Sequence, residues 1–167
     1  MGIEIERRFL VENDKWKSKV ILSEELRQGY LNSEIKDWTV RVRIVNTNEG
    51  FLTLKSLIHD FINHEFEYPI PIQDAIELLN LSKYIISKTR YQLRDNGKNW
   101  IVDSFHNLNA SLEIAEIELK SQSEKINVPS WCGIEITGNK SLSNACLAKT
   151  PISTLSLKDR LKDNKSS

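Results

Sequence analysis

The chain of 167 residues is 40% hydrophobic and 28% charged, which is the composition of an ordinary globular domain. Its 23 Lys and Arg residues are matched by 23 Asp and Glu residues, so it lacks the basic excess typical of nucleic-acid-binding domains. No apolar run approaches the roughly 20 residues of a membrane-spanning helix, and the charged N-terminus has no signal-peptide core. We therefore expect one domain over residues 1–152 and a polar tail over residues 153–167, with neither nucleic acid nor membrane as a partner.

Alternating apolar and polar residues in the first half of the chain predict five β-strands. In chain order these strands cover residues 4–11, 24–32, 38–45, 51–57 and 61–70. Asn13 or Asp14 should cap a short helix that runs to about Val20. Residues 48–50 carry the composition of a turn.

The second half continues the pattern with helices between strands. Pro71 should open a helix over residues 74–81. The sequence Asn96-Gly97 joins two alternating stretches and predicts a β-hairpin. The remaining predicted elements are strands over 84–94, 98–106, 112–119 and 133–137 and a short helix over 143–149. Antiparallel strands with a few short helices indicate an α+β fold dominated by a strongly curved sheet or a closed barrel.

The cysteines and histidines suggest neither a disulfide framework nor a zinc site. Cys132 and Cys146 form no CxxC pair and are expected to be reduced thiols in the cytoplasm. His59, His64 and His106 are scattered and match no HxH or HExxH spacing.

Charged side chains recur at alternate positions, and therefore on one face, of strand after strand. They are Glu4, Glu6, Arg8, Arg41, Arg43, Lys55, Glu65, Glu67, Lys88, Arg90, Asp103, Glu116, Glu118 and Glu135. One interpretation is a half-solvated sheet with cross-strand ion pairs outside and an apolar barrel interior, which periodicity alone favours. The other is a barrel turned inside out, with the charges lining a water-filled bore. The matched signs at positions i and i+2, and the amphipathic helices available to cover an apolar outer face, favour this second interpretation.

A bore of this kind has a natural ligand. Arg and Lys bind phosphate oxygens, and Arg does so through a two-pronged guanidinium. Carboxylates bind Mg²⁺ or Mn²⁺, which in turn bridge phosphate oxygens. A chain of linked phosphates with a divalent metal therefore matches both signs of charge at once.

The ordered set of strand motifs resembles the CYTH domain, or triphosphate tunnel metalloenzyme, family. The opening Glu4-x-Glu6-x-Arg8 is similar to the family signature ExExK, with Arg8 in place of the lysine. The further matches run along nearly the whole chain: Gln28-Gly29-Tyr30-Leu31, Arg41-Val42-Arg43, Thr53-Leu54-Lys55, Glu65-Phe66-Glu67-Tyr68, Lys88-Thr89-Arg90-Tyr91, Trp100-Ile101-Val102-Asp103, Ala115-Glu116-Ile117-Glu118-Leu119 and Glu135-Ile136-Thr137-Gly138. Asn139 stands where the resemblance leads us to expect an acidic residue.

The resemblance implies an eight-stranded antiparallel barrel whose tunnel binds a triphosphate with a divalent metal. The short chain and its opening residues look most like the bacterial branch that hydrolyses inorganic tripolyphosphate to pyrophosphate and phosphate. A class IV adenylyl cyclase and a non-catalytic polyphosphate- or nucleotide-binding module are the alternatives. A homodimer is expected from family habit alone.

Roles for individual residues follow from this resemblance as hypotheses. The metal ligands should be Glu4, Glu6, Asp103, Glu116 and Glu118, with Mg²⁺ or Mn²⁺ as the metal. The phosphate chain should be bound by Arg8, Arg41, Arg43, Lys55, Lys88 and Arg90. Catalytic roles are expected for Lys55, Lys88, Glu65 and Glu67, and Glu65, Glu67 or Glu135 should orient the attacking water.

Overall fold

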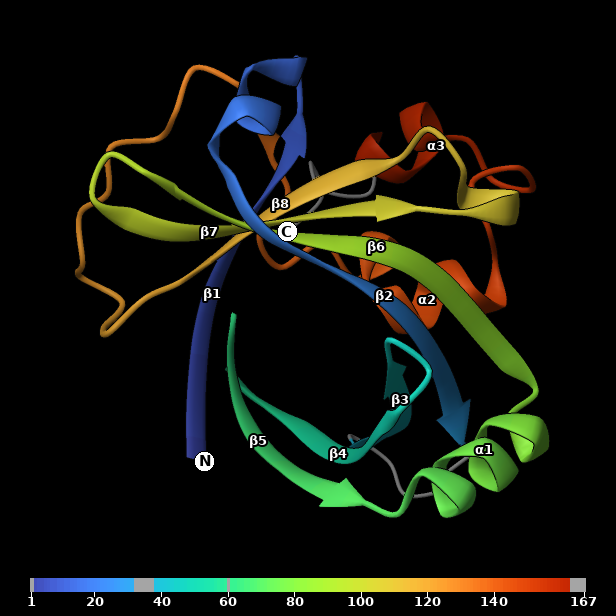
Figure 1. Ribbon diagram of the computed structural model, residues 1–167. Helices are drawn as coiled ribbons and strands as arrows, with labels where there is room; N and C mark the ends of the chain where they lie inside the picture. Colours follow the sequence, from blue (N-terminus) through green and yellow to red (C-terminus); the bar gives the residue numbers. More distant parts are fainter. Residues whose placement is uncertain (1, 32–37, 60, 163–167) are drawn as a thin grey trace.

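The computed structural model describes residues 2–31, 38–59 and 61–162 and shows a closed antiparallel β-barrel (Figure 1). The strands are β1 (Gly2–Val11), β2 (Val20–Leu31), β3 (Trp38–Val45), β4 (Glu49–His59), β5 (Ile62–Ile70), β6 (Tyr84–Asp95), β7 (Lys98–Phe105), β8 (Glu113–Glu118) and β9 (Cys132–Glu135). The helical segments are η1 (Asp14–Lys19), α1 (Ile72–Leu81), η2 (Asn107–Asn109), η3 (Lys140–Leu142), α2 (Asn144–Lys149) and α3 (Leu157–Lys162). Within these ranges no helix combines the length and the apolar character needed to cross a bilayer.

The first strand closes the barrel because it is shared by both ends of the sheet. The strands run in the order β5-β4-β3-β2-β6-β7-β8-β1, and the first four residues of β1 pair with Ile62–Glu65 of β5. Figure 1 shows β1 and β5 side by side where the ring is completed. Further along β1, β9 takes the place of β5 on the same strand. The predicted eight-stranded barrel is confirmed, and β9 extends it.

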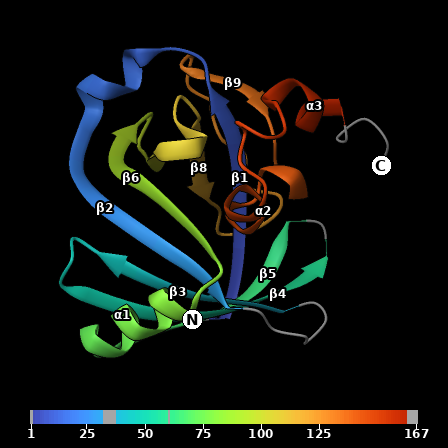
Figure 2. The same ribbon diagram turned by 90° about the vertical axis from the view of Figure 1, so that its right-hand side faces the viewer.

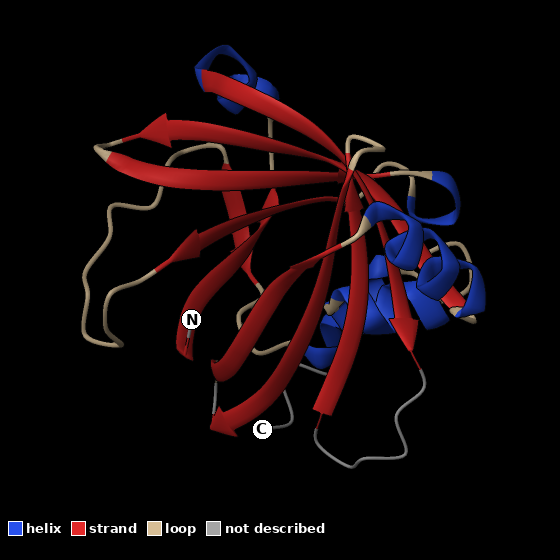
Figure 3. Cartoon of the chain, turned by 60° about the horizontal axis from the view of Figure 1, so that its bottom comes forward, coloured by secondary structure: helices blue, strands red, loops and turns tan. Residues whose placement is uncertain are grey.

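The apolar residues lie mainly on the outside of the strands, so the inside-out interpretation is confirmed. Phe9, Trp100 and Ile117 alternate with the charged positions and pack with Trp16 of η1 and Trp131. On β3, the outward Val42 and Ile44 are covered by α1. Figure 2 shows α1 beside β3 and, elsewhere on the barrel, α2, which contacts β6. Short helical segments thus cover parts of the apolar outer face of the barrel (Figure 3).

Several predicted element bounds agree with the structure. Asn13 caps η1 by accepting a hydrogen bond from the backbone of Lys15, and Ser143 caps α2. The β6–β7 hairpin turns at Asn96 and Gly97, both with positive φ, as Asn-Gly requires. One bound differs, because the strand expected at 24–32 begins earlier, at Val20.

The structure corrects three other expectations. The turn predicted over 48–50 lies two residues earlier, over 46–48, where Asn46 and Thr47 have positive φ and after which β4 begins at Glu49. Glu135 does not point into the bore, because its register opposite the outward Phe9 places it on the outer face. Part of the segment expected as a polar tail over 153–167 folds as α3, whose Arg160 is fully buried.

Gly50 allows α1 to lie directly against the barrel. A Cβ atom built at Gly50 would lie 2.6 Å from Cβ of the fully buried Ala75 in α1. Real Cβ atoms do not approach so closely, so this position accepts only glycine while α1 keeps its place.

Gly50→Ala should therefore lower the free energy of unfolding by about 1–3 kcal/mol through overpacking, as measured by denaturant unfolding. Ala75→Gly alone should cost about 1 kcal/mol from helix propensity. In the double variant the second change makes room for the first, so its loss should be smaller than the sum of the two single losses. Additive losses would show that the contact with α1 is not the reason for this glycine.

Candidate active site

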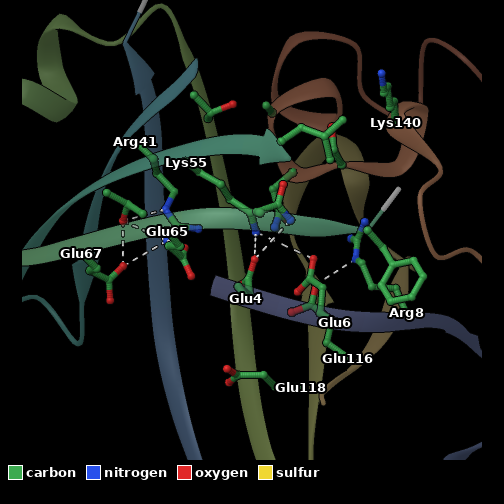
Figure 4. A pocket seen from close by; sticks show the side chains of 18 of the residues that line it. Glu4, Glu6, Arg8, Arg41, Lys55, Glu65, Glu67, Glu116, Glu118 and Lys140 are labelled. Atoms are coloured by element: carbon green, nitrogen blue, oxygen red, sulfur yellow. Dashed lines mark hydrogen bonds and ion pairs between the residues drawn. The ribbon is translucent and has the colours of Figure 1, made fainter. Parts of the chain in front are cut away.

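A cavity of about 750 Å³ lies inside the barrel and is lined by the inward side chains of most strands. The charged lining consists of Glu4, Glu6 and Arg8 on β1, Arg41 and Arg43 on β3, Lys55 on β4, Glu65 and Glu67 on β5, Arg90 on β6, Glu116 and Glu118 on β8, and Lys140 on η3. Figure 4 shows the labelled side chains of β1, β3, β4, β5 and β8 converging from different strands. The charged residues that alternate along separate strands therefore lie together in one cavity.

The first group of ion pairs lies between β3 and β5. One Glu67 oxygen accepts from Arg43 Nη2 at 2.6 Å, and the other accepts from Arg41 Nη2 at 3.1 Å and from the Thr53 hydroxyl at 2.7 Å. Glu65 has a weaker contact, with Arg41 Nη2 at 3.5 Å. Burial and the positive charge of Arg41 lower the pKa of Arg43, whose buried Nε has no hydrogen-bond partner among the described residues. Arg41 and Arg43 are thus held close together in this group, where their mutual repulsion favours the binding of an anion.

The second group joins β1 to β4. Lys55 Nζ pairs closely with Glu4 and lies 3.9 Å from Glu6 Oε1. Lys55 therefore neutralises Glu4 more than Glu6.

The third group is deeper and links β1, β6, β7 and β8. Arg8 Nε donates to Glu116 Oε1 at 3.1 Å, and Arg90 Nη2 donates to the other Glu116 oxygen at 3.2 Å. Arg90 also binds both oxygens of Asp103 at 2.8 Å, and Lys88 Nζ donates to Asp103. Burial by itself opposes ionisation of Asp103, but Arg90 and Lys88 hold its pKa well below its ordinary value.

Lys88 and Asp103 are the predicted site residues that lie behind the cavity wall rather than on it. Both side chains are fully buried, and neither lines the cavity. Burial lowers the pKa of Lys88 to about 8, although Asp103 acts in the opposite direction. They reach the cavity lining through Arg90, which binds Asp103, and through Asn144, whose side-chain oxygen accepts from Lys88 Nζ at 3.3 Å.

The carboxylates of β1 and β8 are suited to a divalent cation. Glu6 and Glu118 face each other as direct cross-strand partners, an arrangement of like charges that is unfavourable on its own. Burial and the negative charge of Glu116 raise the pKa of Glu6 to about 7. Among the described residues no three acidic, His or Cys side chains already converge as a ligand set. The excess of negative charge at Glu6 nevertheless fits a cation held between the two strands.

Sequence reasoning missed several polar residues of the lining. Thr53 and Asn63 share a face with Lys55 and Glu65, so alternation alone could have found them. Lys140 and Asn144 come from η3 and α2 and follow no strand periodicity.

Glu135, one of the three residues considered for orienting water, binds Arg7 on the outer surface with both oxygens, at 2.8 and 2.7 Å.

Comparisons with known proteins agree with this architecture. A family model described as CYTH domain matches residues 2–145. An inorganic triphosphatase from Acetivibrio thermocellus is 41% identical over 155 residues, which cover 90% of this chain and 96% of that protein. The crystal structure of the inorganic triphosphatase NE1496 has a TM-score of 0.63 at 31% identity and covers 89% of this chain and 95% of that one.

A more distant structural relative shows the fold alone. The Hippeastrum protein HpAC1, studied as an adenylyl cyclase and found to have a dominant triphosphatase activity, has a TM-score of 0.51 at 14% identity. The match covers 72% of this chain and 80% of that one.

The raised pKa of Glu6 can be measured by carboxyl-carbon NMR in the metal-free protein. We expect a titration at about 7 rather than near the ordinary value of 4.5, and Mg²⁺ should lower it because the cation favours the ionised form. A titration below about 5 without metal would contradict the buried, like-charged environment.

The same shift makes stability depend on pH. Since the folded-state pKa of Glu6 lies above the unfolded-state value, the folded protein loses stability as pH rises from about 4.5 to about 7. Without metal, Glu6→Gln should therefore be more stable than the parent by about 1–3 kcal/mol near pH 8, with no difference near pH 4.

Proposed function

Because this chain belongs to the CYTH domain family, we propose that it hydrolyses inorganic tripolyphosphate to pyrophosphate and orthophosphate. The enzyme is then a phosphoric anhydride hydrolase that uses a divalent metal ion. The observation that carries the proposal is a cavity inside the barrel that presents Arg41, Arg43 and Lys55 from one side and the carboxylates of β1 and β8 from another. A linear polyanion with a bound cation is complementary to both sides.

The cations of β3 and β4 would bind the phosphate chain by exchanging partners. Arg41, Arg43 and Lys55 already donate to the carboxylates of Glu67 and Glu4, so phosphate oxygens would replace oxygens of the same kind and charge. Their partly exposed side chains make this exchange accessible from the cavity. Arg8 and Arg90 would bind the phosphate chain from the deeper side of the cavity while keeping their ion pairs with Glu116.

The carboxylates that would hold the metal ion are Glu4, Glu6, Glu116 and Glu118. CYTH triphosphatases are typically metal-dependent, and we propose Mg²⁺ or Mn²⁺ here because all of these ligands are hard oxygen donors. When bound, the ion would supply positive charge to the phosphate oxygens during transfer. Asp103 accepts from Arg90 and Lys88 on its two oxygens and, unlike Glu116, does not line the cavity, so we assign it the role of orienting Arg90 instead of binding metal directly. Lys88 is fully buried and paired with Asp103, so it would act indirectly, by holding Asp103 in place against Arg90.

Glu65 is the residue that we propose for orienting the attacking water. The oxygens of Glu67 are occupied by Arg41, Arg43 and Thr53, whereas the contact of Glu65 with Arg41 is long, at 3.5 Å. A water held by Glu65 would attack the terminal phosphorus, the anhydride bond would break, and pyrophosphate would leave. The proton lost by the water would pass to the Glu65 carboxylate.

A cytoplasmic location and a homodimer, both predicted from the sequence, stay proposals. Cys132 and Cys146 are both free thiols, in keeping with a reducing compartment.

The deciding experiment is phosphate release from tripolyphosphate, ATP and thiamine triphosphate, each with Mg²⁺, Mn²⁺ or EDTA. Release that needs metal and is fastest with tripolyphosphate would support the proposal. Formation of cyclic AMP from ATP would show an adenylyl cyclase instead. Tight, metal-dependent binding without turnover would show a binding module.

Two variants test the assignment of inward residues against a matched outward control. Arg43→Ala and Glu6→Gln should each reduce kcat/KM for tripolyphosphate by at least about 100-fold, because each removes a charge that faces the transferred group. Arg7→Ala removes the same kind of residue as Arg43 from an ion pair, but on the outer face with Glu135. Its activity should stay within about twofold of the parent, since exposed pairs contribute little. Near-parent activity of Arg43→Ala would defeat the assignment.

A further inference from the structure

One wall of the cavity is not made by a β-strand. Residues 138–145, here called the end wall, consist of a turn, η3 and the first residues of α2. The end-wall residues that line the cavity are Gly138, Asn139, Lys140, Ser143, Asn144 and Ala145. A strand is held in place by its neighbours' backbone, but a segment of this kind needs other contacts to fix it.

On its inner side the end wall is held by two residues of the charged network. Arg8 Nη2 donates to the backbone carbonyl of Leu142 at 3.1 Å while its Nε binds Glu116. Lys88 Nζ lies 3.3 Å from the side-chain oxygen of Asn144. The two-pronged head of Arg8 thus binds the sheet and the end wall at the same time, which a lysine head at this position would do less well.

On its outer side the end wall is held by Arg160 of α3. The Arg160 guanidinium donates to the backbone carbonyls of Ser141 and Thr150 and, at 3.1 Å, of Leu155. The Arg160 carbonyl in turn accepts from Asn139 Nδ2 at 3.1 Å and from the Ser141 hydroxyl at 3.3 Å. One residue therefore joins α3 to both ends of the η3–α2 segment.

Packing alone does not explain an arginine at position 160. Leu157 and Leu161 of α3 already contact the apolar cluster around Leu142 and Leu147. Arg160 is fully buried, and a buried guanidinium is retained only where its donors are satisfied in a fixed geometry. Its donors reach carbonyls of separate chain segments, which fixes the orientation of those segments.

We propose that Arg160 is a positioning residue that sets the end wall and thereby places Lys140 at the cavity for substrate capture. This inference rests on the proposed function, because it gives Lys140 the role of attracting the triphosphate. Lys140 is exposed, lines the cavity, and has no ion pair among the residues that the structure describes. Figure 4 shows it apart from the paired side chains, so its charge is available to an entering polyanion.

The test compares Arg160→Met, Lys140→Ala and the double variant. Arg160→Met should raise KM for tripolyphosphate about tenfold with kcat within about twofold, because the residues around the scissile bond stay in place. Lys140→Ala should raise KM in the same way. The double variant should be no worse than Arg160→Met, since both changes remove one interaction. Arg160→Lys, with a single donor group, should fall between parent and Arg160→Met, and it carries the test if Arg160→Met does not fold.

Asp95→Asn is the control for a purely structural effect. Asp95 is buried and binds Lys19 and Trp131 at 2.6 and 2.7 Å, away from the end wall, so its change should lower Tm and leave KM unaltered. An unchanged KM in Arg160→Met, or KM effects that multiply in the double variant, would overturn the proposal.

Calorimetric binding of tripolyphosphate separates this proposal from the proposed function. If the parent binds without hydrolysis, the proposed function fails, and the end wall is still tested by a rise of about tenfold in Kd for Arg160→Met. If the parent neither binds nor hydrolyses tripolyphosphate, both proposals are wrong.

Discussion

The barrel interior must neutralise its own charge, because a closed sheet leaves inward side chains with few neighbours besides one another. The strand register meets this demand by placing opposite charges across from each other. Arg8 lies opposite Glu116, Arg90 opposite Asp103 and Lys55 opposite Glu65. Such cross-strand pairs stabilise a sheet when the charges are opposite and destabilise it when they are alike. The pair of Glu6 and Glu118 breaks the rule, and it does so at the place where a cation would fit.

Filling the bore with charge moves the hydrophobic core to the outside of the sheet. Trp100 packs between Phe9 and Trp131, with ring centroids 5.8 and 5.5 Å away, and Trp16 of η1 packs against Tyr91. These aromatic rings bury large apolar areas with few residues. The long segment after β8 and the short helices are therefore needed for stability, since without them the outer face of the barrel would be exposed to water.

Period-two alternation explains why so much of the barrel could be predicted from the sequence. Residues such as Glu4, Arg41 and Glu116 lie in strands of six to ten residues, where alternation and matched sign identify the inward face. Glu135 lies at the end of a four-residue strand, and its face depends on the pairing of β9 with β1, which no local pattern contains. The burial of Lys88 behind Arg90 and the role of Arg160 depend on contacts between distant segments in the same way.

Charge balance also couples the proposed substrate to the proposed metal. Among the described residues that line the cavity, carboxylates are as numerous as cations, so the free interior is close to neutral. A polyanion that takes over Arg41, Arg43 and Lys55 would leave Glu4, Glu65 and Glu67 without their partners. A partly buried carboxylate without a partner is costly, and more costly still beside bound phosphate. Divalent cations that enter with the polyanion would restore neutrality, so each ligand should increase the affinity for the other.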